Sequence, residues 1–154
     1  MVSVRNHPIS FEDWQSYPAT LDPIHIAWLK NAKKSSTAFA VADIEGVEIS
    51  HKKFLTGVLL FSKKIATYSP EKNVGLLLPS SGGGAIASMA ILALGKTIVN
   101  FNFTAGKKAL KSAAEQAEVK HIYTSRKFLD KMAERGIDLG SFFPNSKLLM
   151  LEDI

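Results

Sequence analysis

Cysteine is absent from the 154 residues of this chain. The absence excludes a disulfide framework, a thiolate metal site and a cysteine nucleophile. Long hydrophobic runs are absent too, because the longest apolar stretch (85–94) is shorter than the about 18 residues that a membrane-spanning helix needs. The first residues have no apolar core, which argues against a signal peptide. We therefore expect a cytoplasmic protein, with peripheral contact at the inner membrane left open.

What is present is ordinary globular composition. Hydrophobic residues make up 46% of the chain and charged residues 21%, which excludes a disordered protein. Lysine and arginine exceed the acidic residues by 19 to 14, giving a formal charge of +5. The length suits one domain with a core of its own.

The first part of the chain predicts an arm and a short helix over residues 1–35. Proline and aromatic residues in 1–21 indicate irregular structure. Asp22 is expected as the N-cap of a helix whose first residue is Pro23 and which runs to about Asn31. This arm and helix form the first of two predicted units.

The second predicted unit, 36–154, is an α/β domain. A hairpin is expected over 37–49, and Ser50 is expected to cap a helix over 51–67. Apolar strands and helices then alternate, which predicts a parallel sheet with helices on both faces. Thr104 and Ser125 are expected to cap two of these helices. The strands are expected at 74–78, 97–101, 120–124 and 147–151, and the helices at 85–94, 105–118 and 126–135. Because no helix follows the last strand to cover it, we expect a domain that is incomplete at its C-terminus and has exposed apolar surface on its last strand and helices, through which it could dimerise.

A glycine-rich turn follows the first of these strands. Its residues are Ser80, Ser81, Gly82, Gly83 and Gly84, and such turns at a helix N-terminus can bind phosphate through free backbone N–H groups. The turn has neither the Lys-Ser/Thr pair of a Walker sequence nor G-x-G-x-x-G spacing. A plain strand-to-helix turn is therefore the favoured interpretation, and a free-standing module that binds a small anion or nucleotide is the alternative.

Catalytic and metal-binding patterns are missing from the sequence. The four histidines are His7, His25, His51 and His121, and no two of them have the spacing of paired metal ligands. We find no G-x-S-x-G elbow and no carboxylate pair placed for acid–base work. The sequence therefore predicts no catalytic residue and no metal site in this chain.

Basic residues are concentrated in one region. Segment 104–135 holds eight basic and four acidic residues, which could steer an acidic protein or an anionic lipid surface. The plainer interpretation is a solvated helix surface. No nucleic-acid-binding motif is present, so we expect no nucleic-acid partner.

Four segments together resemble the beginning of the adenylate-forming enzymes, the AMP-binding superfamily of acyl-CoA synthetases. They are 43–55, 74–81, 90–104 and 122–129. Within the superfamily, NFNFTAGKK (100–108) and IYTSRKFLDK (122–131) are most similar to the acyl-ACP synthetase half of 2-acylglycerophosphoethanolamine acyltransferase/acyl-ACP synthetases, with Phe103 at a tyrosine position.

The resemblance implies a parent ligase that joins a fatty acid to ATP as acyl-AMP, with ATP and magnesium as its cofactors. The acyl group would pass to the thiol of an acyl carrier protein or CoA, and then to a lysophospholipid acceptor in the acyltransferase branch. The family's phosphate loop, ribose-binding aspartate, hinge and catalytic lysine are not in this sequence. The chain therefore resembles only the N-terminal portion, which would need the remaining part of the enzyme. We expect it to bind no cofactor and to be inactive alone.

The resemblance also implies a carrier-binding region. In relatives that use CoA, the loop after the second strand and the turn after the third help to hold the thiol carrier. The corresponding residues here are Asn100, Phe101, Asn102, Arg126 and the adjacent Lys127. The alternative is structural: Phe101 packs in the core, and the two asparagines satisfy a turn.

Overall fold

The computed structural model describes residues 22–43 and 46–153. The predicted arm over 1–21 lies outside the described residues, as does the middle of the predicted hairpin turn. The elements follow in the order α2 (Ile24–Ala32), β1 (Phe39–Ala42), β2 (Glu48–Ser50), α3 (His51–Tyr68), β3 (Asn73–Leu76), α4 (Gly82–Ala93), β4 (Thr97–Asn100), α5 (Lys107–Gln116), β5 (His121–Thr124), α6 (Arg126–Ala133), the 3-10 helix η1 (Leu139–Phe142), β6 (Lys147–Met150) and the 3-10 helix η2 (Leu151–Asp153).

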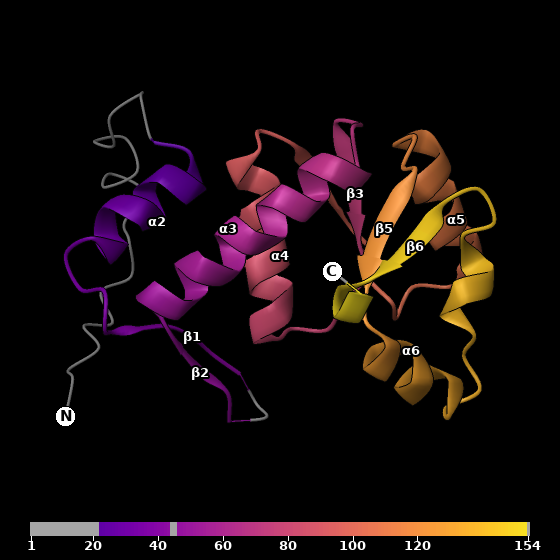
Figure 1. Cartoon of the computed structure of the whole chain (residues 1–154). Helices are drawn as coiled ribbons and strands as arrows, with labels where there is room; N and C mark the ends of the chain where they lie inside the picture. The colour runs from indigo at the N-terminus through magenta and orange to yellow at the C-terminus, as the bar shows by residue number, and fades with distance from the viewer. Residues whose placement is uncertain (1–21, 44–45, 154) are drawn as a thin grey trace, which may run out of the picture.

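Two sheets make up the strand content of the described residues. β1 and β2 form an antiparallel hairpin. The other four strands form a parallel sheet in the order β4-β3-β5-β6. Figure 1 shows α3 and α4 on one side of this sheet and α5 and α6 on the other. The predicted α/β class, with helices on both faces, is confirmed.

Each face of the sheet has its own core. Val74 and Leu76 of β3 pack with α3 and α4 in one cluster of buried side chains. Leu77, which follows β3, packs with α5 and α6 in the other. Gly75 also faces the second cluster, because a Cβ there would lie 2.7 Å from Ile122 Cγ1. The alternation along β3 is that of a strand buried on both faces.

Two of the predicted helix caps are confirmed. The Ser50 side chain accepts a hydrogen bond from the Lys53 N–H at 3.4 Å, and Ser125 accepts one from the Phe128 N–H at 3.1 Å. A serine at this position satisfies one of the N–H groups that lack a partner within the helix. These serines fix where α3 and α6 begin.

Two other predicted caps are wrong. Pro23, not Asp22, is the N-cap of α2, and the Asp22 carboxylate instead pairs with Lys30 at 2.6 Å. Thr104 does not cap α5, which begins two residues after Ala105 behind Gly106. The Thr104 N–H and hydroxyl both donate to Asn102 Oδ1, at 3.0 and 2.7 Å. The asparagine thus closes a local turn that holds Thr104 outside the helix.

Helix α4 begins at Gly82 rather than at the predicted Ala85. The three glycines are therefore the first turn of the helix and not a loop before it. A Cβ on Gly82 would lie 2.7 Å from Ile49 Cδ1, and one on Gly84 would lie 3.0 Å from the Pro79 carbonyl oxygen. Close packing against the hairpin and the preceding loop explains glycine here, despite its low helix propensity.

We expected exposed apolar side chains on the last strand, but the structure exposes them elsewhere. The side chains of β6 after Lys147 are half-buried. The exposed large hydrophobic side chains of the described residues are Ile24, Phe39, Val47, Leu59, Leu60, Tyr68 and Leu94. They lie on or beside α2, the hairpin, α3 and α4. The prediction failed because Leu148 packs against the core on one face of the sheet and Leu149 against the core on the other. The exposed large hydrophobic side chains all precede β4 in the chain.

Candidate functional site

The carboxyl ends of the parallel strands are the first place to look for a site. From β3 the chain passes to β4 on one side, and it later returns to β5 on the other side of β3. In open α/β sheets, ligands bind beyond the carboxyl ends of the strands where the order reverses in this way. Two cavities lie at this edge, one on each side of the loop that follows β3.

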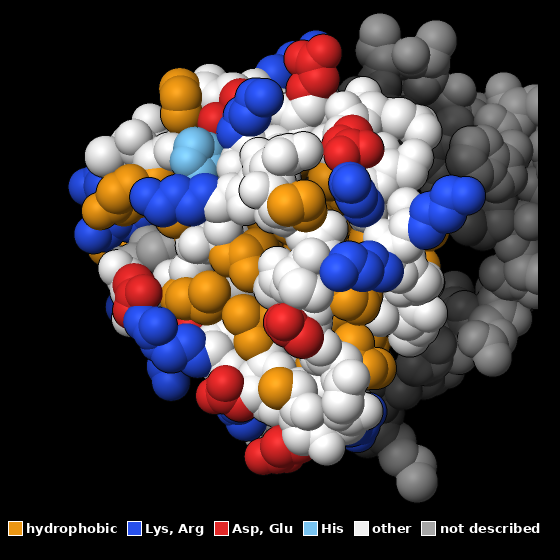
Figure 2. Space-filling model, turned by 90° about the vertical axis from the view of Figure 1, so that its right-hand side faces the viewer, with side chains coloured by type: hydrophobic (Ala, Val, Ile, Leu, Met, Phe, Trp, Pro, Cys, Tyr) orange, Lys and Arg blue, Asp and Glu red, His pale blue; other side chains and the backbone are white. Residues whose placement is uncertain are grey.

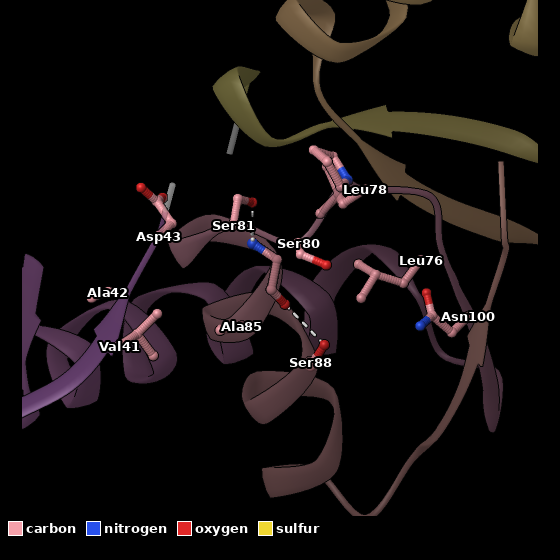
Figure 3. Close-up of a pocket in the computed structure, with 12 residues that line it drawn as sticks. Val41, Ala42, Asp43, Leu76, Leu78, Ser80, Ser81, Ala85, Ser88 and Asn100 are labelled. Atoms are coloured by element: carbon pink, nitrogen blue, oxygen red, sulfur yellow. Dashed lines mark hydrogen bonds between the residues drawn. The ribbon is translucent and has the colours of Figure 1, made fainter. Parts of the chain in front are cut away.

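The larger cavity, here called the Asn100 cavity, has a volume of about 670 Å³. Ser80, Ser88 and Asn100 are among its polar lining residues, and Val41 of the hairpin is among its apolar ones. Figure 3 shows these side chains around the start of α4. The Ser88 hydroxyl donates to the Gly84 carbonyl oxygen at 2.9 Å, so it is held by the helix. The cavity can accept a small polar molecule, and among the described residues that line it Asp43 is the charged one.

The second cavity, here called the α6 groove, has a volume of about 530 Å³. Its basic lining residues, Lys127, Lys131 and Arg135, belong to α6 and the turn that closes it. Its apolar lining comes from the hairpin, the loop after β4, α6 and η2. These side chains include Val47, Ile49, Phe103, Phe128, Met132 and Leu151. The groove therefore joins an apolar floor to a cationic rim.

A common wall separates the two cavities. It consists of Asp43 and the loop residues Leu78, Pro79, Ser80 and Ser81, which line both. Part of the predicted glycine-rich turn thus lies between two cavities rather than at the bottom of one.

The N-terminus of α4 is occupied by a carboxylate of the chain itself. Asp43 Oδ2 accepts a hydrogen bond from the Gly82 N–H at 3.2 Å, and Ser81 Oγ accepts one from the Gly84 N–H at 3.2 Å. Asp43 Oδ1 also accepts from the Val47 N–H at 3.1 Å, which ties the hairpin to the helix. A carboxylate stabilises a helix N-terminus by the same interactions that would attract a phosphate.

The N-terminus of α6 is built in the same way. Glu152 Oε1 accepts a hydrogen bond from the Arg126 N–H at 2.9 Å, beside the Ser125 cap. The Arg126 guanidinium forms an ion pair with Asp153. Both helices at this edge therefore begin with a serine cap and a carboxylate from a distant segment. Sequence reasoning missed both carboxylates, and the only signal was the Glu152-Asp153 pair after an apolar strand.

The structure separates the residues of the predicted carrier-binding region. Asn100 is exposed and lines the Asn100 cavity, whereas Lys127 lines the α6 groove. Phe101 is 2% exposed and its ring centroid lies 4.8 Å from that of Phe143, so it is a core residue. Asn102 accepts from Thr104, and Arg126 is paired with Asp153. The five residues lie along one edge but do not converge on one point.

The described histidines lie away from both cavities. His121 Nδ1 lies 2.9 Å from Glu71 Oε1, at the amino end of β5. His51 Nδ1 accepts a hydrogen bond from Trp28 Nε1 at 3.1 Å. Within 22–43 and 46–153, no three His, Asp or Glu side chains are grouped as metal ligands. His51 and His121 therefore have structural partners within the fold.

One tyrosine has a clearly shifted pKa, and it belongs to the core. Burial raises the pKa of Tyr123, and a hydrogen bond with Ser69 opposes the shift in part. The two hydroxyl oxygens lie 3.0 Å apart. The tyrosine packs on the α3–α4 face, so it takes no part in either cavity.

The residues present do not fit the phosphates of ATP. The candidate cradle is the N-terminus of α4, where Asp43 and Ser81 already accept from the backbone N–H groups of Gly82 and Gly84. A phosphate would meet the Asp43 carboxylate at this position, and like charges repel.

None of the described helices is both long enough and apolar enough to cross a bilayer.

Known structures share this fold. FmoA3, a nonribosomal peptide synthetase solved with α-methyl-L-serine-AMP bound, matches with a TM-score of 0.71 at 15% identity, over 88% of this chain and 15% of that chain. The N-terminal subdomain of Klebsiella oxytoca NpsA, in complex with 3-hydroxyanthranilyl-AMSN, matches with a TM-score of 0.71 at 11% identity, over 90% of this chain and 33% of that chain. The anthranilate CoA ligase AuaEII, in complex with anthranoyl-AMP, matches with a TM-score of 0.70 at 12% identity, over 90% of this chain and 26% of that chain.

These similarities establish the fold. The chain folds as the N-terminal part of adenylate-forming domains does, and it spans a third or less of the length of these three structures. No model of a known protein family matches the chain.

Proposed function

We propose that this chain is the N-terminal portion of a fatty-acyl-activating ligase. The parent enzyme would form acyl-AMP from a fatty acid and ATP, and would transfer the acyl group to the thiol of an acyl carrier protein or CoA. Transfer onward to a lysophospholipid at the membrane surface follows from the acyltransferase branch that 100–108 and 122–131 resemble.

The observation that carries this proposal is the agreement of fold and sequence over the same part of the chain. The four-stranded parallel sheet with its preceding hairpin superposes on adenylate-forming enzymes over 88 to 90% of the chain. The segments that resemble the superfamily contribute β2, β3, β4 and β5.

Within the parent enzyme, this portion would act as scaffold rather than as the nucleotide site. The Asp43 carboxylate accepts a hydrogen bond at the N-terminus of α4, and the Glu152 carboxylate accepts one at the N-terminus of α6. Both N-termini lie at the carboxyl edge of the sheet. ATP and magnesium would therefore be held by the remaining part of the enzyme. In the predicted carrier-binding region, Asn100 and Lys127 have side chains on a cavity wall, and these two are the proposed contacts of the carrier.

The test is an activity assay on two proteins: the chain alone and the polypeptide to which it belongs in its source. With a fatty acid and ATP, we expect the parent to exchange pyrophosphate into ATP and to load a carrier thiol. We expect the isolated chain to do neither. Turnover by the isolated chain would show that it is not an inactive portion. A parent without fatty-acid-dependent exchange would refute the ligase assignment.

A module that binds a small anion or nucleotide is the second candidate. The observation in its favour is the volume of the Asn100 cavity, about 670 Å³, and its hydrogen-bonding residues Ser80, Ser88 and Asn100, against which stands the Asp43 carboxylate. Gly83→Asp tests it with little steric effect, since a Cβ there meets only Leu151 Cδ1, at 3.8 Å. The new carboxylate would repel an anion while favouring the helix N-terminus. Saturable binding of ATP or phosphate that is lost in Gly83→Asp and kept in Gly83→Ala would favour the module over the ligase scaffold.

A further inference from the structure

Apart from Lys127, the residues that line the α6 groove have no part in the proposed ligase function. We infer that the groove is a docking site for an acidic polypeptide segment that also carries apolar side chains. The inference goes beyond the proposed function and does not depend on it.

The cations of the groove form one row. Lys127 and Lys131 are four residues apart on one side of α6, about 6 Å from each other along the helix axis, and Arg135 follows four residues later in the turn after the helix. All three are exposed and all three line the groove. The acidic residues of the same helix, Asp130 and Glu134, do not line it. The helix thus presents its basic side to the groove.

The spacing of this row favours an extended polypeptide over a single anion. Alternate side chains of a β-strand are about 6.6 Å apart, close to the rise over one turn of α6. Acidic residues at alternate positions could therefore meet successive cations. One phosphate or carboxylate would contact at most part of the row.

The opposite wall supplies apolar contacts. Val47 and Ile49 are two residues apart on the hairpin and both line the groove. Val47 is 45% exposed, whereas Phe128 and Met132 on the floor are only 6% and 4% exposed. Burial of an exposed apolar side chain on binding is favourable. The apolar side chains of an acidic segment would cover this wall.

The carboxylates on the groove wall are already held in place. Asp43 accepts from the backbone of α4 and Glu152 from the backbone of α6. Each of these carboxylates therefore stabilises a helix N-terminus.

The wider face on which α5 and α6 lie does not provide an equivalent site. Figure 2 shows basic and acidic side chains interspersed on this side of the molecule, with hydrophobic side chains between them. A mixture of charges gives no net attraction for an acidic partner. The basic row is specific to the groove.

The experiment uses the whole chain and a fluorescein-labelled peptide in which glutamate and leucine alternate. We expect saturable binding that weakens as salt is added. The double variant Lys131→Glu with Arg135→Glu should raise the dissociation constant about tenfold. The matched control, Lys63→Glu with Lys64→Glu on exposed positions of α3, makes the same change in net charge and should alter it less than about twofold.

A second variant tests the apolar wall without changing charge. Val47→Ser should weaken binding of the glutamate–leucine peptide and leave the weaker binding of a glutamate–serine peptide unchanged. An equal loss of peptide affinity in the Lys63/Lys64 control variant would overturn the inference. So would a failure of the unmodified chain to bind the glutamate–leucine peptide. So would preferential binding of an oligothymidylate or of anionic lipid vesicles, because the groove would then serve a different class of partner.

Discussion

The helices on the two faces of the sheet differ in how completely they are buried. Between Gly84 and Leu92, no residue of α4 is exposed, since α3, the hairpin and the sheet surround the helix. On the other face, α5 and α6 bury only a narrow side, with Leu110 and Ala114 on one helix and Phe128 and Met132 on the other. Every basic side chain of the α6 groove comes from this less buried face.

The difference separates the structural part of the molecule from the part that can meet a partner. Side chains of α4 are committed to packing, so changes there should lower the stability of the fold. The outer sides of α5 and α6 are committed to solvent, so changes there should alter binding with little effect on stability. The predictions below test this division, from the largest expected effect to the smallest.

The largest effect is expected in the core of the α3–α4 face. Ile91 is fully buried, so Ile91→Ala should lower the free energy of unfolding by about 3 kcal/mol through lost burial and a new cavity. Chemical denaturation measures the change. Lys131→Ala on the exposed side of α6 is the control and should change stability by less than about 0.5 kcal/mol. Similar losses in both variants would contradict the division.

Gly75 and Gly57 both lie so close to neighbouring side chains that an added Cβ would come within 3.0 Å of them, but the two sites differ in how easily those side chains can move. A Cβ on Gly75 would lie within 3.0 Å of Ile122, Phe101 and Val119, three side chains fixed in the core, so Gly75→Ala should cost about 2 kcal/mol. A Cβ on Gly57 of α3 would meet only Ile86, whose Cδ1 is the end of a flexible side chain. Thermal unfolding should show Gly57→Ala close to neutral, since alanine also favours the helix by about 1 kcal/mol. A large loss of stability in Gly57→Ala would mean that the Ile86 side chain between α3 and α4 cannot move aside.

Alkaline pH should act on the α3–α4 face through Tyr123. Burial raises the pKa of this phenol in the folded protein, despite its hydrogen bond with Ser69. Its contribution to stability is present below the unfolded-state pKa of about 10 and is lost as pH rises through the folded pKa. Urea unfolding between neutral and alkaline pH should show this fall. Tyr123→Phe, compared with Tyr68→Phe at an exposed position, should reduce the slope. An unchanged slope would assign the effect to other groups.

The smallest effect is a stabilisation on the α5–α6 face. Glu118, just after α5, has a φ of 50°, in the left-handed region that favours glycine. Glu118→Gly should raise the free energy of unfolding by about 0.5 to 1 kcal/mol, and Glu118→Ala should not. Differential scanning calorimetry distinguishes the two. A lower melting temperature for the glycine variant would contradict this account of the turn.

Much of the fold follows from local signals in the sequence. The apolar segments predicted all four parallel strands, and each predicted strand end lies within two residues of the observed one. Ser50 and Ser125 correctly marked the starts of two helices. Where prediction failed, a contact stronger than local preference decided the structure. Asn102 holds Thr104 in a turn, and Ile49 packs so closely on Gly82 that the glycines become helix.

The candidate site depended on contacts between distant residues and was predicted only in part. Asp43 reaches Gly82 across 39 residues, and Glu152 reaches Arg126 across 26. Spacing along the chain carries no information about such pairs until the strand order is known. Sequence reasoning therefore found the glycine-rich turn and Lys127 but not the carboxylates that close both helix N-termini or the row of cations beside the groove.

The central claim is that this chain is a scaffold portion of a larger adenylate-forming ligase. The most direct test is the intact mass of the native polypeptide, recovered from its source with an antibody raised against this chain. The account predicts a mass well above the 16.8 kDa of the chain. A native polypeptide of 16.8 kDa would contradict it and would favour a free-standing binding module.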